Sequence, residues 1–246
     1  MIQVFPDPEA LSRGAAEFFV STARTAVAAR GRFSVALSGG GTPRRTYELL
    51  AQPAFRDRLP WAQSHVFWGD ERCVEPEDPR RNARLAKGAL LNHVPLPAGQ
   101  VYPMLCHPTP AAGARSYEAL LRNFFGTGAP RFDLILLGLG ENGHTASLFP
   151  GDPVLREPER WVAAVYVAEQ DLYRLTLTAA IINQARVVAF LVAGAAKAAV
   201  VQEVRQGPRD PRRLPAQLIQ PERGELHWLL DQGAAGSLPR RPAAQV

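Results

Sequence analysis

Residues 132–151, which read FDLILLGLGENGHTASLFPG, place a histidine in a glycine-rich turn directly after an apolar run. The apolar run predicts a buried β-strand, and open α/β sheets gather their chemistry where such strands end. Glycine lets the backbone approach a ligand closely, and histidine takes up and releases a proton near neutral pH. His144 is therefore our candidate for an acid–base residue. The alternative is a tight turn whose histidine has no chemical role.

The same turn contains a literal G-x-G-x-x-G at Gly138, Gly140 and Gly143, the pattern of dinucleotide-binding loops. That motif requires a long helix next, and then a strand that ends in an acid about 20 residues further on. Here Pro150 and Gly151 follow closely and end any helix that begins in the turn. The context therefore argues against a dinucleotide site.

A second glycine-rich loop, SGGGT at residues 38–42, lies between the apolar run 33–37 and a predicted helix. Backbone N–H groups and the positive end of a helix bind anions. The loop lacks the Gly-Lys-Ser/Thr ending of a nucleotide P-loop, so it predicts a phosphate site without implying a nucleoside triphosphate. The alternative is a plain connection between a strand and a helix.

A third polar segment, Asp70, Glu71 and Arg72, follows the apolar run 66–68. An acid and an arginine at a strand end orient hydroxyl groups or bind a carboxylate or phosphate, and the alternative is a structural ion pair. Because parallel strands end at one edge of their sheet, we expect the three polar segments to converge.

Strands that alternate with helices predict βαβ units and a mostly parallel sheet. We expect one domain at residues 1–238 and a loose tail at residues 239–246. The expected strands lie at residues 33–37, 65–68, 132–137, 162–167, 172–177, 187–193 and 225–230. The expected helices lie between an N-cap at Asp7 and Gly31, and at residues 44–51, 82–92, 110–125, 178–184 and 195–205.

Composition bounds the class of protein. With 46% hydrophobic and 21% charged residues, nothing indicates disorder. The first residues show no signal peptide, and the apolar stretch 187–201 is too short and too polar to span a membrane. We therefore expect a cytoplasmic protein with no membrane partner. The formal charge is +5, but the basic residues are scattered, so we expect no nucleic-acid partner.

Cysteine and lysine are both rare. Cys73 and Cys106 are widely spaced, which indicates neither a disulfide framework nor a metal site. No histidine cluster suggests zinc, and we expect no metal and no other cofactor. Only two of the 28 basic residues, Lys87 and Lys197, are lysines. Where arginine fills most basic positions, a retained lysine indicates a need for a compact ammonium, which makes Lys197 a candidate site residue.

Taken together, these motifs resemble the 6-phosphogluconolactonase branch of the glucosamine-6-phosphate isomerase/6-phosphogluconolactonase family. The resemblance spans nearly the whole chain in the family's order. It is carried by LSGGGTP at residues 37–43, WGDER at 68–72, LGLGENGHTASLFPG at 137–151, RLTLT at 174–178, and LVAG at 191–194. It implies a Rossmann-like, doubly wound fold and a hydrolase without a metal. The implied reaction converts 6-phospho-D-glucono-1,5-lactone to 6-phosphogluconate in the oxidative pentose phosphate pathway.

The resemblance also implies roles for individual residues. His144 is implied as the general base, with Asp70 and Asn142 as further catalytic residues. The family often has Asp where Asn142 stands, and an amide holds an imidazole but does not neutralise an imidazolium. The implied substrate-binding residues are Ser38, Gly39, Gly40, Gly41, Thr42, Arg72, Arg174 and Lys197.

Lactone hydrolysis needs an activated water, a place for the oxyanion and a proton for the leaving ring oxygen. The chain has no Gly-x-Ser-x-Gly elbow for a nucleophilic serine, and neither cysteine lies in a glycine turn. The mechanism that remains is direct attack by a water molecule that His144 deprotonates. The alternatives are a sugar-phosphate isomerase or deaminase on the same fold, or a non-catalytic sugar-phosphate-binding module. The expected partner is the phosphosugar lactone, and the expected assembly is a monomer or small homo-oligomer.

Overall fold

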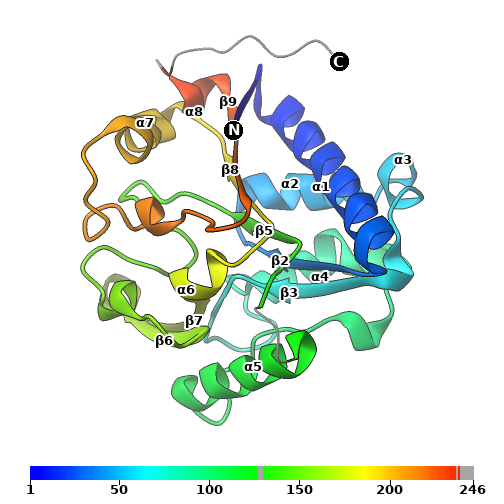
Figure 1. The fold of residues 1–246 in the computed structure, drawn as a ribbon, viewed down its shortest axis with the longest axis horizontal. Coiled ribbons are helices and arrows are strands. Elements are labelled where there is room, and N and C mark those ends of the chain that lie inside the picture. Colours follow the sequence, from blue (N-terminus) through cyan, green and yellow to red (C-terminus); the bar gives the residue numbers. More distant parts are fainter. Residues whose placement is uncertain (127–129, 237, 239–246) are drawn as a thin grey trace.

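A six-stranded parallel sheet forms the centre of the computed structural model, which describes residues 1–126, 130–236 and 238 (Figure 1). Neighbouring strands are parallel throughout this sheet. The predicted mostly parallel α/β fold is therefore confirmed. The strand order is β1 (Ile2–Phe5), β9 (Glu225–Asp231), β8 (Val187–Val192), β5 (Leu134–Leu137), β2 (Phe33–Leu37) and β3 (Ser64–Trp68).

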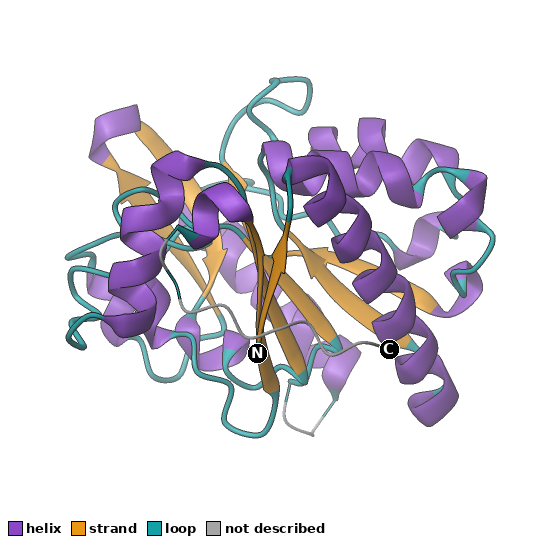
Figure 2. Cartoon of the chain, turned by 90° about the horizontal axis from the view of Figure 1, so that it is seen from above, coloured by secondary structure: helices purple, strands orange, loops and turns teal. Residues whose placement is uncertain are grey.

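Helices cover both faces of this sheet (Figure 2). Every residue of β2 and β5 is buried, which explains why both strands read as continuous apolar runs. The helices are α1 (Pro8–Arg30), α2 (Gly41–Leu50), α3 (Pro53–Arg56), α4 (Asn82–Ala89), α5 (Pro110–Phe125), α6 (Ala179–Ile182), α7 (Ala198–Gln206) and α8 (Gln232–Ala235).

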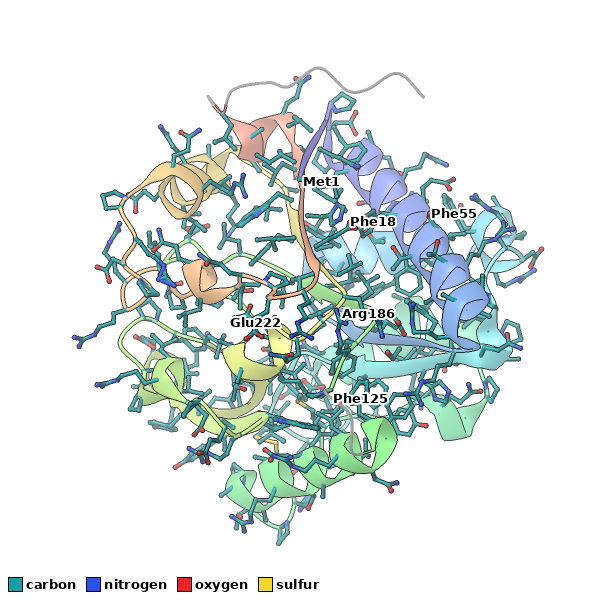
Figure 3. The ribbon with its side chains drawn as sticks, viewed as in Figure 1. Met1, Phe18, Phe55, Phe125, Arg186 and Glu222 are labelled. Atoms are coloured by element: carbon teal, nitrogen blue, oxygen red, sulfur yellow. A yellow bond between two sulfur atoms is a disulfide. The ribbon has the colours of Figure 1, made fainter. Side chains whose placement is uncertain are left out.

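Helix α1 begins and ends where its sequence signals predict. The Asp7 side chain accepts a hydrogen bond from the Ala10 N–H, and Pro8 occupies the first turn. The helix stops at Gly31, whose φ of 72° is a left-handed conformation that glycine adopts without strain. The helix packs on the sheet through rings such as Phe18, which lies 4.7 Å from His227 of β9 between ring centroids (Figure 3).

A separate three-stranded antiparallel sheet stands beside the parallel one, in the order β4 (Asp70–Arg72), β7 (Leu172–Leu177) and β6 (Val162–Val167). Helix α5 packs against β6 and β7. Strands β6 and β7 have their predicted bounds, but β4 is not apparent in the sequence. Its three polar residues have no apolar alternation, and β7 supplies the pairing that makes them a strand.

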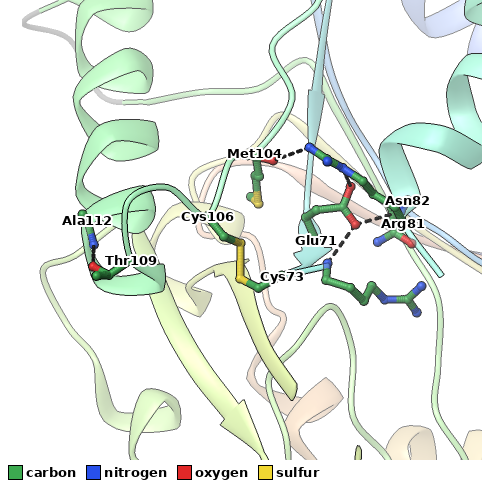
Figure 4. The surroundings of a disulfide bond; sticks show 9 residues. Glu71, Cys73, Arg81, Asn82, Met104, Cys106, Thr109 and Ala112 are labelled. Carbon is green, nitrogen blue, oxygen red and sulfur yellow. Dashed lines mark hydrogen bonds and ion pairs between the residues drawn. A yellow bond between two sulfur atoms is a disulfide. The ribbon is translucent and has the colours of Figure 1, made fainter. Parts of the chain in front are cut away.

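The two cysteines form a disulfide, so the expectation of no disulfide from their spacing is wrong (Figure 4). Cys73 and Cys106 are 33 residues apart in sequence, yet their Cα atoms lie 5.5 Å apart. Cys73 directly follows β4, and Cys106 lies in the segment that leads into α5. The spacing of the two cysteines in the sequence does not reveal that they lie close together, because their distance depends on how the two sheets are placed.

Two further expectations concern membrane spans and the C-terminal tail. No helix among the described residues is long and apolar enough to cross a membrane. The tail expected at residues 239–246 lies outside the described residues.

Candidate functional site

The carboxyl ends of β2, β5 and β8 meet at one edge of the parallel sheet, where their loops surround a cavity of about 330 Å³. We call residues 38–42 the glycine loop and residues 138–147 the histidine turn. The predicted convergence of three polar segments occurs, because Asp70 and Arg72 of β4 face the same cavity. The predicted residues in its lining are Ser38, Gly39, Gly40, Gly41, Thr42, Asp70, Arg72, His144, Arg174 and Lys197.

Asn142 lies behind His144 and fixes its tautomer. The Asn142 side-chain oxygen is 2.5 Å from Nδ1 of His144 and also accepts the His144 main-chain N–H at 3.2 Å. Since an atom that accepts a main-chain N–H is the amide oxygen, Nδ1 must carry the proton. The second ring nitrogen, Nε2, is therefore the basic one.

The surroundings of His144 favour the neutral ring. Burial, with a further contribution from the Arg174 charge, lowers the pKa of His144 to about 4, although Asp70 opposes the shift. The Phe149 ring stacks on the imidazole with 4.5 Å between centroids. His144 is thus unprotonated near neutral pH and able to accept a proton.

Two glycines are required by close contacts at the site. A Cβ at Gly140 would overlap the ring of His144, and one at Gly39 would overlap the side chain of Asn82. At these two positions the backbone itself packs against polar side chains of the site, so a side chain would not fit there.

Asp70 is a buried carboxylate held by side chains from three segments. Its Oδ2 accepts a hydrogen bond from Ser147 Oγ at 2.7 Å, and its Oδ1 accepts one from Asn82 Nδ2 at 3.2 Å. Arg174 Nη1 lies 3.6 Å from Oδ2. The carboxylate is therefore fixed in orientation at the cavity wall.

Several buried polar atoms of the cavity residues have no hydrogen-bond partner among the described residues. They are the Nε atoms of Arg72 and Arg174, Ser38 Oγ and Asn82 Oδ1. Buried polar atoms are normally paired, so these four atoms mark where the residues around the cavity leave polar groups without a protein partner. Two guanidinium donors favour an anion, while a hydroxyl and an amide oxygen suit sugar hydroxyl groups.

The glycine loop is held from below by Tyr47. The buried Tyr47 hydroxyl donates to the Ser38 carbonyl at 2.8 Å and accepts the Ser38 N–H at 3.1 Å. The loop then enters α2 through Gly40, whose φ is 108°. Across the cavity, Lys197 Nζ lies 3.7 Å from Glu141 Oε1. A helix N-terminus and a lysine therefore border the same cavity.

The sequence did not single out three residues that touch this site. Ser147 holds Asp70, and Gln170 accepts a hydrogen bond from Arg174 Nη2 at 2.5 Å. Asn82, at the start of the expected helix 82–92, donates to the main-chain and side-chain oxygens of Asp70 and packs against Gly39. Of these three residues, Ser147 could have been found from the sequence, because it lies within the histidine turn.

Comparisons with known proteins agree with this geometry. Residues 6–228 match the family model described as glucosamine-6-phosphate isomerases/6-phosphogluconolactonase. The chain is 48% identical to a 6-phosphogluconolactonase of Synechocystis over 87% of this chain and 88% of the relative. It is 39% identical to a 6-phosphogluconolactonase of Mycobacterium tuberculosis over 97% of this chain and 98% of the relative.

Solved structures are similar over the same extent. A crystal structure of a devB protein has a TM-score of 0.88 and 31% identity, covering 97% of this chain and 100% of that one. The 6-phosphogluconolactonase of Trypanosoma brucei has a TM-score of 0.84 and 29% identity, covering 97% of this chain and 98% of that one. With its fold, its motifs and its relatives in agreement, the chain belongs to the glucosamine-6-phosphate isomerase/6-phosphogluconolactonase family.

Proposed function

We propose that this protein is a lactonase that hydrolyses 6-phospho-D-glucono-1,5-lactone to 6-phosphogluconate, the step its relatives are named for. The observation that carries the proposal is a neutral His144, held as the Nδ1-H tautomer, in a cavity lined by the guanidinium groups of Arg72 and Arg174. A basic imidazole nitrogen activates water, and the cationic donors suit a phosphorylated substrate.

His144 acts on both halves of the reaction. Its Nε2 takes a proton from a water molecule as the water oxygen attacks the lactone carbonyl carbon. The tetrahedral intermediate then collapses, the bond to the ring oxygen breaks, and the imidazolium gives its proton to that oxygen. Because the low pKa of His144 makes the imidazolium a strong acid, the second transfer is favoured. An N–H of the histidine turn stabilises the oxyanion.

The remaining site residues bind and orient the substrate. The N–H groups of the glycine loop, Arg72, Arg174 and Lys197 surround the cavity with positive potential and hold the phosphate. Asp70 accepts hydrogen bonds from sugar hydroxyls, and Asn142 maintains the His144 tautomer. Binding energy from the phosphate thus orients the carbonyl toward the attacking water.

The expectations for the cellular setting form part of the proposal. We place the enzyme in the cytoplasm, as a monomer or small homo-oligomer that acts on a small phosphosugar without nucleic acid. Residues 1–238 act as one lactonase domain, since the site draws on loops from residue 38 to residue 197.

The decisive experiment generates the lactone in situ with glucose-6-phosphate dehydrogenase and follows its loss. Wild type should accelerate the loss over an enzyme-free control, and His144→Ala should lose about 10²–10⁴-fold in rate, the usual contribution of a general base. His93→Ala, at an exposed histidine outside the cavity, is the matched control and should keep full activity. A folded wild type that leaves the spontaneous rate unchanged would favour the isomerase, deaminase or binding-module alternatives.

A further inference from the structure

The disulfide lies next to a residue of the cavity. Cys73 directly follows Arg72, and its main-chain N–H donates to the Tyr173 carbonyl of β7 at 2.9 Å. Cys106, in the segment before α5, is bonded to it across 33 residues of sequence (Figure 4). The covalent link therefore fixes the point where the chain leaves β4 for the loop at residues 73–81, which we call the tether loop.

The tether loop is coupled to the cavity through Arg72. Arg72 Nη1 donates to the carbonyl of Arg80 at 2.5 Å, so the guanidinium position depends on where the loop lies. Arg81, at the end of the loop, donates to the Met104 carbonyl at 3.4 Å, a long hydrogen bond (Figure 4). The disulfide is thus the strong link that joins this loop to the segment before α5.

The loop also leads directly into Asn82. The buried Glu71 carboxylate accepts the N–H groups of Asn82 and Ala83, both at 2.7 Å, and fixes the start of α4. Glu71 holds the far end of the loop, whereas the disulfide holds its near end. Release of the near end would remove the covalent anchor of Cys73, the neighbour of Arg72, and leave Arg72 less firmly placed, while Glu71 keeps α4 and the far end of the loop in place.

The disulfide is accessible from outside the catalytic cavity. Cys73 and Cys106 are both half-buried and line a separate groove of about 1180 Å³. The chain contains two cysteines in total, so a reductant has one target. Exposed disulfides are typically the ones that react with thiols and serve regulation.

We propose that the Cys73–Cys106 disulfide is a redox-controlled tether, whose reduction by a dithiol loosens Arg72 and weakens binding of the anionic substrate. This inference rests on the proposed lactonase function. In the reaction, one thiolate of the dithiol attacks a cystine sulfur and releases the other cysteine as a thiolate. The second thiol of the reductant then displaces the remaining cysteine. Two electrons pass to the protein, two protons end on its thiols, and the reductant becomes a disulfide.

The test compares lactone hydrolysis by oxidised wild type, wild type reduced with dithiothreitol, and the double variant Cys73→Ser/Cys106→Ser. Reduction should raise KM by about fivefold or more, within the usual range of coupling between sites, with a smaller change in kcat. Reoxidation should restore the original KM. The double variant should show the raised KM and no response to dithiothreitol, since it has no disulfide.

A second readout separates this inference from the proposed function. Hydrogen exchange at residues 73–81 should accelerate on reduction, with no substrate present. If oxidised wild type shows no lactonase activity, the proposed function fails. The hydrogen-exchange measurement then tests by itself whether the disulfide restrains the tether loop. An unchanged KM in an active enzyme, unchanged exchange, or alkylation of both thiols before any reduction would each overturn the inference.

Discussion

At the scale of single residues, the position of one proton decides what His144 can do. Its Nδ1 proton is held by the Asn142 oxygen, and its pKa is lowered to about 4 by burial and nearby cations. A base must be deprotonated to act, so the rate is retained down to mildly acidic pH and is lost as the pH falls through about 4. A kcat/KM profile whose acidic limb lies near 6.5, the ordinary histidine value, would contradict this prediction.

Replacement of Asn142 by Asp should move that limb. A carboxylate beside Nδ1 stabilises the imidazolium, and an opposite charge at this distance shifts a pKa by about 1–3 units. Asn142→Asp should therefore shift the acidic limb of kcat/KM upward by about 1–3 pH units. Asn92→Asp, at an exposed asparagine outside the cavity, is the control and should leave the limb where it is in the wild type.

Most residues of the candidate site could be predicted because they lie in motifs at strand ends. Ser147 and Asp70 show why their contact could not: they are 77 residues apart, and their hydrogen bond depends on how β4 pairs with β7. Likewise, the low pKa of His144 could not be predicted, because it results from burial and from charged residues that are distant in sequence. Local sequence identifies polar loops, whereas partners across elements require the three-dimensional arrangement.

At the scale of elements, β5 has a buried anchoring carboxylate, Asp133, before its first residue and the histidine turn after its last. Asp133, just before the strand, is buried and accepts the N–H and Oγ–H of Ser34 at 2.8 and 2.9 Å. It also pairs with Arg30 at 2.8 Å. The histidine turn follows the other end of the strand. The anchoring contacts and the candidate site are therefore separated by the length of one strand.

Asp133→Ala should test that separation. The substitution leaves the Ser34 N–H buried without its partner, which should lower the free energy of unfolding by about 1–3 kcal/mol. Lactone turnover by the folded fraction should stay near the wild-type value. Asp57→Ala removes an exposed pair with Arg56 and should change stability by less than about 1 kcal/mol. Denaturant titration measures both, and equal losses in the two variants would refute the anchoring role.

The helices and strands that could be predicted are those with a clear pattern of apolar residues. The buried strands and the long helices with clear N-caps, such as α5, have the predicted bounds or nearly so. Strand β1 was missed because its four residues are mostly exposed. Strand β4 was missed because its residues are all charged. Both depend on a partner strand that is distant in sequence, so no local pattern marks them.

At the scale of the whole molecule, the disulfide closes a long loop. A bridge across 33 residues restricts the unfolded chain and typically stabilises a protein by about 2–4 kcal/mol. Reduced wild type should therefore unfold at a lower denaturant concentration than oxidised wild type. The Cys73→Ser/Cys106→Ser variant should unfold at the same concentration with or without reductant. Equal midpoints for the two forms of the wild type would show that the bridge adds nothing to global stability.

The pairing of β1 with β9 has a consequence for how the protein is made. Ile2 lies opposite Trp228, so β1 is synthesised long before the strand that it pairs with. Until β9 is made, residues 2–5 lack their partner strand, and an unpaired strand edge promotes association between chains. Nascent chains that stall before residue 225 should therefore engage chaperones through residues 2–5.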